Sequence, residues 1–92
     1  MPPELRAEKI LHRIVNAIVD NTEEIQIRSL VTERGIVFEV TVAAGDVGKM
    51  IGKQGRNASA IRELLSAIGA AAKTRYGLEI VSASYSSRDQ AV

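Results

Sequence analysis

The sequence has no cysteine and few aromatic residues, with one phenylalanine, two tyrosines and no tryptophan among its 92 residues. The missing cysteines exclude disulfides, thiolate metal sites and cysteine nucleophiles, and they fit a reducing compartment. So few rings leave the protein poorly equipped to bind nucleic acid by stacking bases on aromatic side chains. No apolar run approaches the length of a membrane span, and the N-terminal residues lack the pattern of a secretory signal. We therefore expect a cytoplasmic protein.

Charge is nearly balanced over the whole chain but unevenly distributed along it. Twelve lysines and arginines oppose eleven acids, for a formal net charge of +1. Residues 48–62 contain four cations and no acid; these cations are Lys49, Lys53, Arg56 and Arg62. A nearly neutral protein with one basic segment is typical of a local anion site rather than of a polycation. The length fits a single domain.

The spacing of apolar residues predicts the element order helix, strand, strand, helix, helix, strand. The expected helices cover 4–20, 47–51 and 57–75, and the expected strands cover 24–32, 36–42 and 78 to about 85. We expect Asn21 and Gly77 to end their helices in the left-handed conformation and Asp46 to cap the short helix.

A hairpin followed by a two-helix crossover predicts two antiparallel strands and a third strand parallel to one of them. The resulting fold class is α+β, with a three-stranded mixed sheet. The three helices are expected on one face, because three are too few to cover both. Residues 86–92 are polar, and we expect them to form a disordered tail.

The segment between the two later helices combines glycine with positive charge. Residues 47–57 read Val-Gly-Lys-Met-Ile-Gly-Lys-Gln-Gly-Arg-Asn, with three glycines and three cations. Glycine permits positive φ and close approach of another backbone. The first turn of the following helix offers unpaired N–H groups and the positive end of a dipole, which together accept phosphate. We expect this segment to bind a nucleic-acid backbone, with Ile51 as apolar surface for bases; the predicted binding residues are Gly48, Lys49, Ile51, Gly52, Lys53, Gln54, Gly55, Arg56 and Asn57.

Two common nucleotide sites do not fit this segment. A P-loop needs Ser or Thr after Gly-Lys to bind magnesium, whereas Gln54 follows Gly52-Lys53. A dinucleotide fingerprint needs Gly-x-Gly-x-x-Gly, and the spacing from Gly48 to Gly52 is wrong for it. The sequence shows no metal-ligand cluster, catalytic triad or carboxylate pair, so we expect no enzyme, no metal and no cofactor.

The run Ile51-Gly52-Lys53-Gln54-Gly55, with Val47 and Met50 before it and Ile61 after it, resembles the Ile-Gly-x-x-Gly signature of KH domains. The loop of that signature clamps about four nucleotides of backbone. The element order αββααβ is similar to the type II KH arrangement. The chain length and the run from Asp46 to Ala58 resemble the small bacterial single-KH proteins of the KhpA family.

This resemblance implies a single KH domain over residues 1–85 that binds single-stranded RNA without catalysis. It implies a groove between the loop, its two flanking helices and the second strand. It further implies a homodimer, or a heterodimer with a larger multidomain KH protein. The cellular roles that it implies are post-transcriptional regulation, RNA chaperone activity and effects on cell shape.

A second hypothesis is a small adaptor or dimerisation module whose main ligand is another protein. The near-neutral charge and the alanines of the long helix favour it. These alanines indicate either helix propensity or close approach of another helix, and the sequence leaves both readings open.

Overall fold

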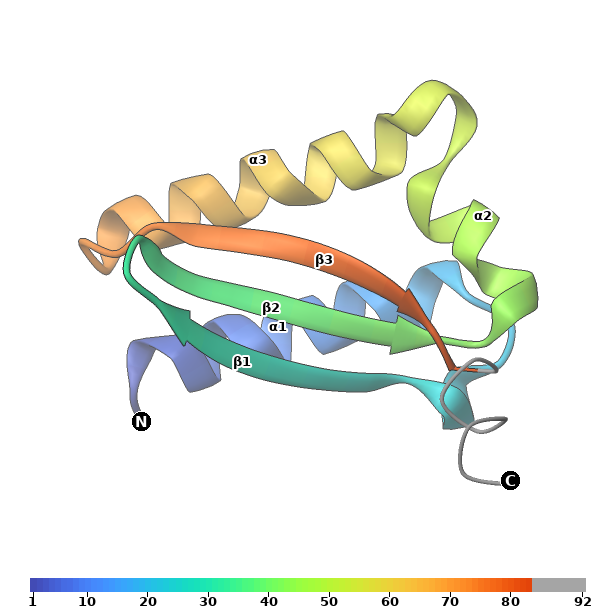
Figure 1. Ribbon diagram of the computed structural model, residues 1–92, viewed down its shortest axis with the longest axis horizontal. Helices are drawn as coiled ribbons and strands as arrows, with labels where there is room; N and C mark the ends of the chain where they lie inside the picture. The colour runs from blue at the N-terminus through green and yellow to red at the C-terminus, as the bar shows by residue number, and fades with distance from the viewer. Residues whose placement is uncertain (84–92) are drawn as a thin grey trace.

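A three-stranded sheet forms the centre of the protein in the computed structural model, which describes residues 1–83 (Figure 1). The predicted order αββααβ is confirmed. The elements are α1 (Pro3–Ile18), β1 (Gln26–Thr32), β2 (Gly35–Val42), α2 (Val47–Ile51), α3 (Arg56–Ala71) and β3 (Tyr76–Ser82). The predicted tail and the expected end of the last strand near residue 85 lie outside the described residues.

The sheet is mixed, as the sequence predicts. Strand β2 is central, with β1 antiparallel on one edge and β3 parallel on the other. Phe38 of β2 lies opposite Ser29 of β1 and beside Leu78 of β3. Strand β1 begins two residues later than predicted, because residues 22–24 form a 3₁₀ turn.

Alternate residues of β2 form the floor of the core. Phe38, Val40 and Val42 are fully buried, because successive side chains of a strand point to opposite faces. The Phe38 ring meets the Tyr76 ring edge to face, with centroids 5.1 Å apart. All three helices contribute to this cluster, so they cover the same face of the sheet; their buried side chains are Ala7, Leu11, Val15, Met50, Ile61 and Leu65.

Helix α1 ends earlier and differently than predicted. Its last residue is Ile18, and Val19 already has an extended backbone. Asn21 has φ −99°, so the predicted left-handed termination at this residue is wrong. Asn21 is held instead by a carboxylate that lies 25 residues further along the chain.

That carboxylate belongs to Asp46, which was predicted to cap α2 and does not. Its buried side chain accepts hydrogen bonds from the backbone N–H groups of Asp20 (3.2 Å) and Asn21 (2.9 Å) and from Nδ2 of Asn21 (3.0 Å). These bonds, with the Asn21 N–H foremost, lower the pKa of Asp46 although its desolvation opposes them. Asp46 therefore ties the α1–β1 connection to the start of α2.

Helix α3 also ends before its predicted boundary. It closes in a Schellman motif, in which the N–H of Thr74 donates to the Gly69 carbonyl (2.9 Å) and the N–H of Lys73 to the Ala70 carbonyl (3.2 Å). Lys73, with φ 56°, takes the left-handed position that was predicted for Gly77. Gly77 lies within β3, because the chain must already be extended at Tyr76 to pair with Ile36.

None of the helices within residues 1–83 is long and apolar enough to cross a membrane.

The role of Asp46 can be tested with Asp46→Asn, which turns an amide N–H₂ toward N–H donors. We expect a lower urea midpoint at pH 7 than in the wild type. Because the pKa of Asp46 is below its ordinary value of 3.8 in the folded protein, its contribution is present above that value and is lost as the pH falls through the folded pKa. The wild type should therefore lose more stability than the variant between pH 6 and about pH 3.

The matched control is Asp20→Asn, which removes an exposed carboxylate from the same connection and should barely move the midpoint. Equal midpoints for Asp46→Asn and the wild type would contradict the assigned role.

Candidate nucleic-acid interface

The loop between α2 and α3 projects from one end of the protein (Figure 1). Three of its residues have positive φ: Gly52 (79°), Gln54 (57°) and Gly55 (76°). The N–H of Gly55 donates to the Gly52 carbonyl at 3.0 Å and closes the turn. Lys53 sits at the tip between these positions, so the backbone presents it to solvent.

The two loop glycines are required for different reasons. A Cβ on Gly52 would lie 2.6 Å from Cγ and 2.8 Å from the backbone nitrogen of Asn57, and its φ and ψ (79°, 171°) are open almost only to glycine. A Cβ on Gly55 would meet no described atom within 4 Å. Gly52 is therefore fixed by internal packing, whereas the side of Gly55 is open to an approaching ligand.

Asn57 joins the two helices that flank the loop. Its Nδ2 donates to the Lys49 carbonyl at 2.8 Å, across the gap between the end of α2 and the start of α3. Asn57 was predicted as an RNA contact, and the structure gives its side-chain amide a structural bond. The sequence offered no signal for this bond, since it depends on the turn geometry.

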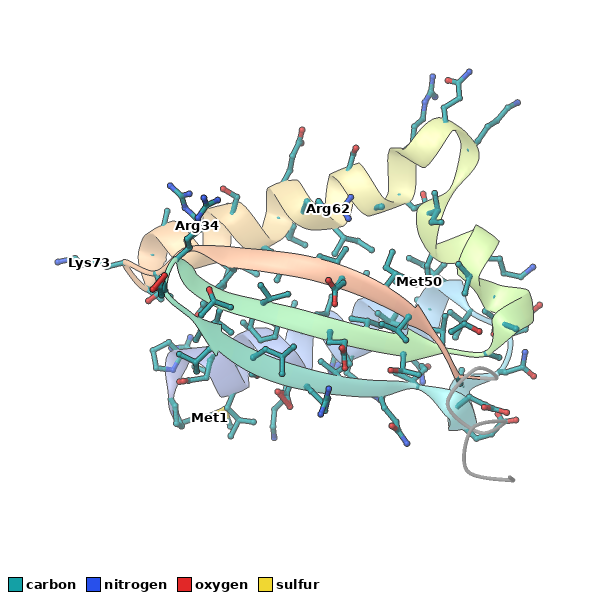
Figure 2. The ribbon with its side chains drawn as sticks, viewed as in Figure 1. Met1, Arg34, Met50, Arg62 and Lys73 are labelled. Atoms are coloured by element: carbon teal, nitrogen blue, oxygen red, sulfur yellow. The ribbon has the colours of Figure 1, made fainter. Side chains whose placement is uncertain are left out.

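The cations of the loop are available to an anion. Lys53 and Arg56 are exposed and form no ion pair within residues 1–83. Lys49 meets Asp20 at 3.5 Å, but both side chains are largely exposed (45% and 76%), so this pair contributes little. Figure 2 shows long side chains of the loop extending away from the protein.

The N-terminus of α3 adds a fixed positive field to these mobile charges. Its N-cap is Gly55, and no described side chain caps it by a hydrogen bond. The first N–H groups of a 16-residue helix therefore face outward beside Lys53 and Arg56. The structure thus brings the loop glycines, Lys53, Arg56 and the N-terminus of α3 together at one end of the protein.

The apolar pair before the loop divides between core and surface. Met50 is fully buried and anchors α2, whereas Ile51 is 42% exposed beside the loop. Gly48 lies on the exposed side of α2, and a Cβ there would meet no described atom within 4 Å. A helical glycine costs about 1 kcal/mol relative to alanine, and internal packing gives no reason for it here.

The groove implied along the second strand needs correction. Strand β2 is the central strand of the sheet, between β1 and β3. Strand β3 is the strand that packs along α3 (Figure 1). Any groove that continues from the loop along α3 is therefore bordered by β3.

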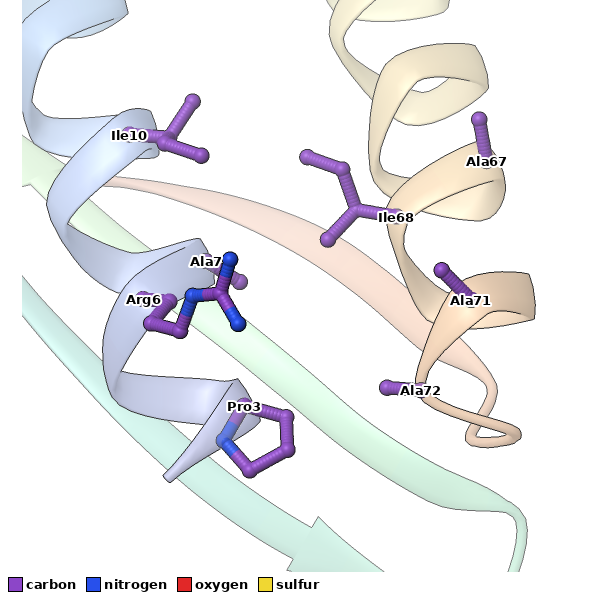
Figure 3. A pocket seen from close by; sticks show the side chains of 8 residues that line it. All are labelled: Pro3, Arg6, Ala7, Ile10, Ala67, Ile68, Ala71 and Ala72. Atoms are coloured by element: carbon purple, nitrogen blue, oxygen red, sulfur yellow. The ribbon is translucent and has the colours of Figure 1, made fainter. Parts of the chain in front are cut away.

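The opposite flank of α3 borders an apolar groove that the sequence did not place. A hollow of about 450 Å³ separates α1 from α3 (Figure 3). It is lined by Pro3, Arg6, Ala7, Ile10, Ala67, Ile68, Ala71 and Ala72. A second hollow of about 270 Å³ lies between the same helices and is lined by Ile14, Ile18, Asn57, Ala60, Ile61 and Leu64. The small residues of α3 were the available signal: Ala60, Ala67 and Ala71 line the two hollows, whereas Ala70 lines neither.

Residues 1–83 contain no group of three or more His, Cys, Asp or Glu side chains that could hold a metal ion.

The different constraints on the two loop glycines predict unequal costs of substitution. Gly52→Ala should lower the free energy of unfolding by about 3 kcal/mol, because the methyl group collides with Asn57 in addition to the strained backbone. Gly55→Ala should cost only about 1 kcal/mol, for the left-handed φ alone. Urea denaturation measures both values.

Gly45→Ala is the matched control, since Gly45 has no positive φ and open space at its Cβ. A Gly52→Ala variant as stable as Gly55→Ala would show that the contact with Asn57 does not constrain the turn.

Comparison with known proteins agrees with the architecture. The sequence profile of the KhpA/KhpB KH domain matches residues 8–80. A protein named RNA-binding protein KhpA from Chlamydia trachomatis is 39% identical over 74 residues, which cover 80% of this chain and 95% of the relative. Proteins of the same name are 43% identical in Treponema pallidum (80% and 92% covered) and 45% identical in Streptomyces coelicolor (67% and 78% covered). No solved structure matched. The chain belongs to the KhpA/KhpB family of KH-domain proteins.

Proposed function

We propose that the protein binds single-stranded RNA through the loop between α2 and α3. The observation that carries this proposal is a glycine turn that holds two cations, neither in an ion pair within residues 1–83, beside a helix N-terminus that no described side chain caps. The relatives named above are RNA-binding proteins by name. Membership in this family agrees with the expectation that the protein is not an enzyme.

Phosphates would bind where the fixed and mobile positive charges meet. The first N–H groups of α3 can donate to phosphate oxygens, and the open side of Gly55 lets the sugar-phosphate backbone come close. Lys53 and Arg56 neutralise the charge from either side. Lys49 can exchange its exposed partner Asp20 for a phosphate at little cost.

Bases would lie against aliphatic rather than aromatic surface. Ile51 is the exposed apolar side chain nearest to the loop, and Gly48 beside it leaves room for close approach. The amide of Gln54 can reach a base edge or a phosphate. A loop that touches about four nucleotides is not very selective, so partners or dimerisation would add specificity and avidity. A role as a cytoplasmic post-transcriptional regulator or RNA chaperone, with effects on cell shape, stays a prediction.

The double variant Lys53→Asp with Gln54→Asp should abolish RNA binding, because it places negative charge at the phosphate site. Its circular dichroism spectrum should match that of the wild type, since both side chains are exposed. Fluorescence anisotropy with labelled RNA measures the affinity over a range of salt concentrations. Three phosphate contacts predict a wild-type slope of about −2 in log affinity against log salt, at about −0.7 per contact.

The control, Lys9→Asp with Asn16→Asp, makes the same change in charge on the exposed face of α1. It should bind RNA nearly as well as the wild type. A folded loop variant that still binds, or a wild-type affinity independent of salt, would overturn the proposed site.

A second function, association with another copy of this chain, is favoured by the apolar groove between α1 and α3. Alanines on the α3 side let a second helix come close, and exposed Ile10 and Leu64 offer apolar area for it to cover. Burial of such side chains drives most protein association. The implied heterodimer with a larger multidomain KH protein stays a prediction.

Ala67→Glu should disrupt this association, because it puts a charge into the apolar groove. The control is Ser66→Glu, one position away and outside the groove. Sedimentation velocity should show dimers for the wild type and Ser66→Glu, and monomers for Ala67→Glu. A wild type that is monomeric throughout would refute this second function.

A further inference from the structure

A second group of cations lies at the end of α3 opposite the RNA-binding loop. It consists of Arg34 in the β1–β2 turn and of Lys73 and Arg75 in the α3–β3 connection, and we name it the far-end cluster. Figure 1 shows these two connections at the same end of the protein, away from the α2–α3 loop. Figure 2 labels Arg34 and Lys73 there.

The fold holds the two connections together. The N–H of Ile36 donates to the Arg75 carbonyl at 2.9 Å, at the first pair of the parallel β2–β3 ladder. Gly35 has φ 143° and approaches the Arg75 backbone so closely that no side chain could be accommodated. Arg34 directly precedes Gly35, so its backbone lies close to that of Arg75.

The cations of the far-end cluster form no ion pair with a carboxylate within the described residues. The two ion pairs among residues 1–83 join Arg28 to Glu39 and Lys49 to Asp20. Glu33 precedes Arg34 in the turn, so the two connections together contain three cations and one acid. Like charges held together repel one another, and an external anion relieves that repulsion.

Positive and negative charges are also distributed unequally between the first and the second half of the chain. Residues 47–83 contain six cations and two acids, Glu63 and Glu79, whereas residues 1–46 contain five cations and eight acids. The loop, α3 and the α3–β3 connection therefore carry the positive charge, although the net charge is only +1. Arg62, exposed and without an ion pair among residues 1–83, lies partway along α3 between the two basic ends.

The distance between these ends suits a strand longer than the loop alone can hold. Helix α3 has 16 residues, so it spans about 24 Å at 1.5 Å per residue. At about 3.4 Å per stacked nucleotide, that length corresponds to about seven nucleotides. The loop of a KH domain clamps only about four.

We propose that the far-end cluster is a second phosphate-binding site for the same RNA strand, so that the bound strand runs along α3 from the loop to Arg34, Lys73 and Arg75. This inference rests on the proposed function of the loop. It assigns RNA, rather than an acidic protein, to the cluster, because cations lie at the loop, at Arg62 partway along α3 and at the cluster beyond the end of the same helix.

The test compares a 4-nucleotide and a 12-nucleotide RNA of random sequence on the double variant Arg34→Gln with Lys73→Gln. Affinity for the 12-nucleotide RNA should fall about tenfold at 0.15 M salt, and its salt slope should become shallower by about 1.4, as expected for two lost phosphate contacts. Affinity for the 4-nucleotide RNA, measured by NMR titration, should not change. Unaltered thermal unfolding confirms that the variant is folded.

The matched control is Lys9→Gln with Arg13→Gln, which removes two exposed charges from α1. It should bind both RNAs as the wild type does. A far-end variant that binds the 12-nucleotide RNA as tightly as this control would overturn the second site and leave the loop site intact. A wild type that binds neither RNA would overturn both the second site and the proposed function.

Discussion

The packing of Gly52 against Asn57 is the contact on which the geometry of the candidate site depends. It leaves no room for a side chain at Gly52, and it places the Asn57 amide on the Lys49 carbonyl. The chain must then reverse through Gln54 and Gly55 with positive φ. As a result the first turn of α3 starts uncapped and faces outward. The steric contact between Gly52 and Asn57 thus sets the turn, the outward-facing start of α3 and the exposure of Lys53 and Arg56.

This turn needs a firm base, because α2 has only five residues and could not be stable as an isolated helix. The fully buried side chain of Met50 anchors α2 in the core. Asp46 fixes its beginning to the α1–β1 connection through three hydrogen bonds. The loop is therefore carried by tertiary contacts, and its geometry can be set before a ligand arrives.

The regular elements were predictable from the sequence because their signals are local. Alternation of apolar residues through Phe38, Val40 and Val42 indicates a strand with one buried face, and the helical stripes of α1 and α3 are equally direct. The features that were predicted wrongly depend on distant partners. Local sequence favours Asp46 as a cap, but its donors lie 25 and 26 residues away. Gly77 looks like a helix terminator, but pairing of β3 with β2 requires the turn earlier, at Lys73.

The candidate site was likewise predictable only where its parts are close together in the sequence. Its glycines, cations and helix terminus are adjacent in the chain, so their proximity could be predicted. The far-end cluster joins residues 34 and 73–75, and the groove joins α1 to α3, so neither could be placed without the fold. The two hollows between α1 and α3 extend to Ala72, beside Lys73, and to Asn57, beside the loop.

The most direct test of this account is the position of RNA on the protein surface. A 12-nucleotide RNA that contains 4-thiouridine can be photo-crosslinked to the wild-type protein, and the modified peptides can be identified by mass spectrometry. The account predicts crosslinks within residues 48–62 and in the β1–β2 turn or the α3–β3 connection. Crosslinks confined to the exposed face of α1 would contradict it.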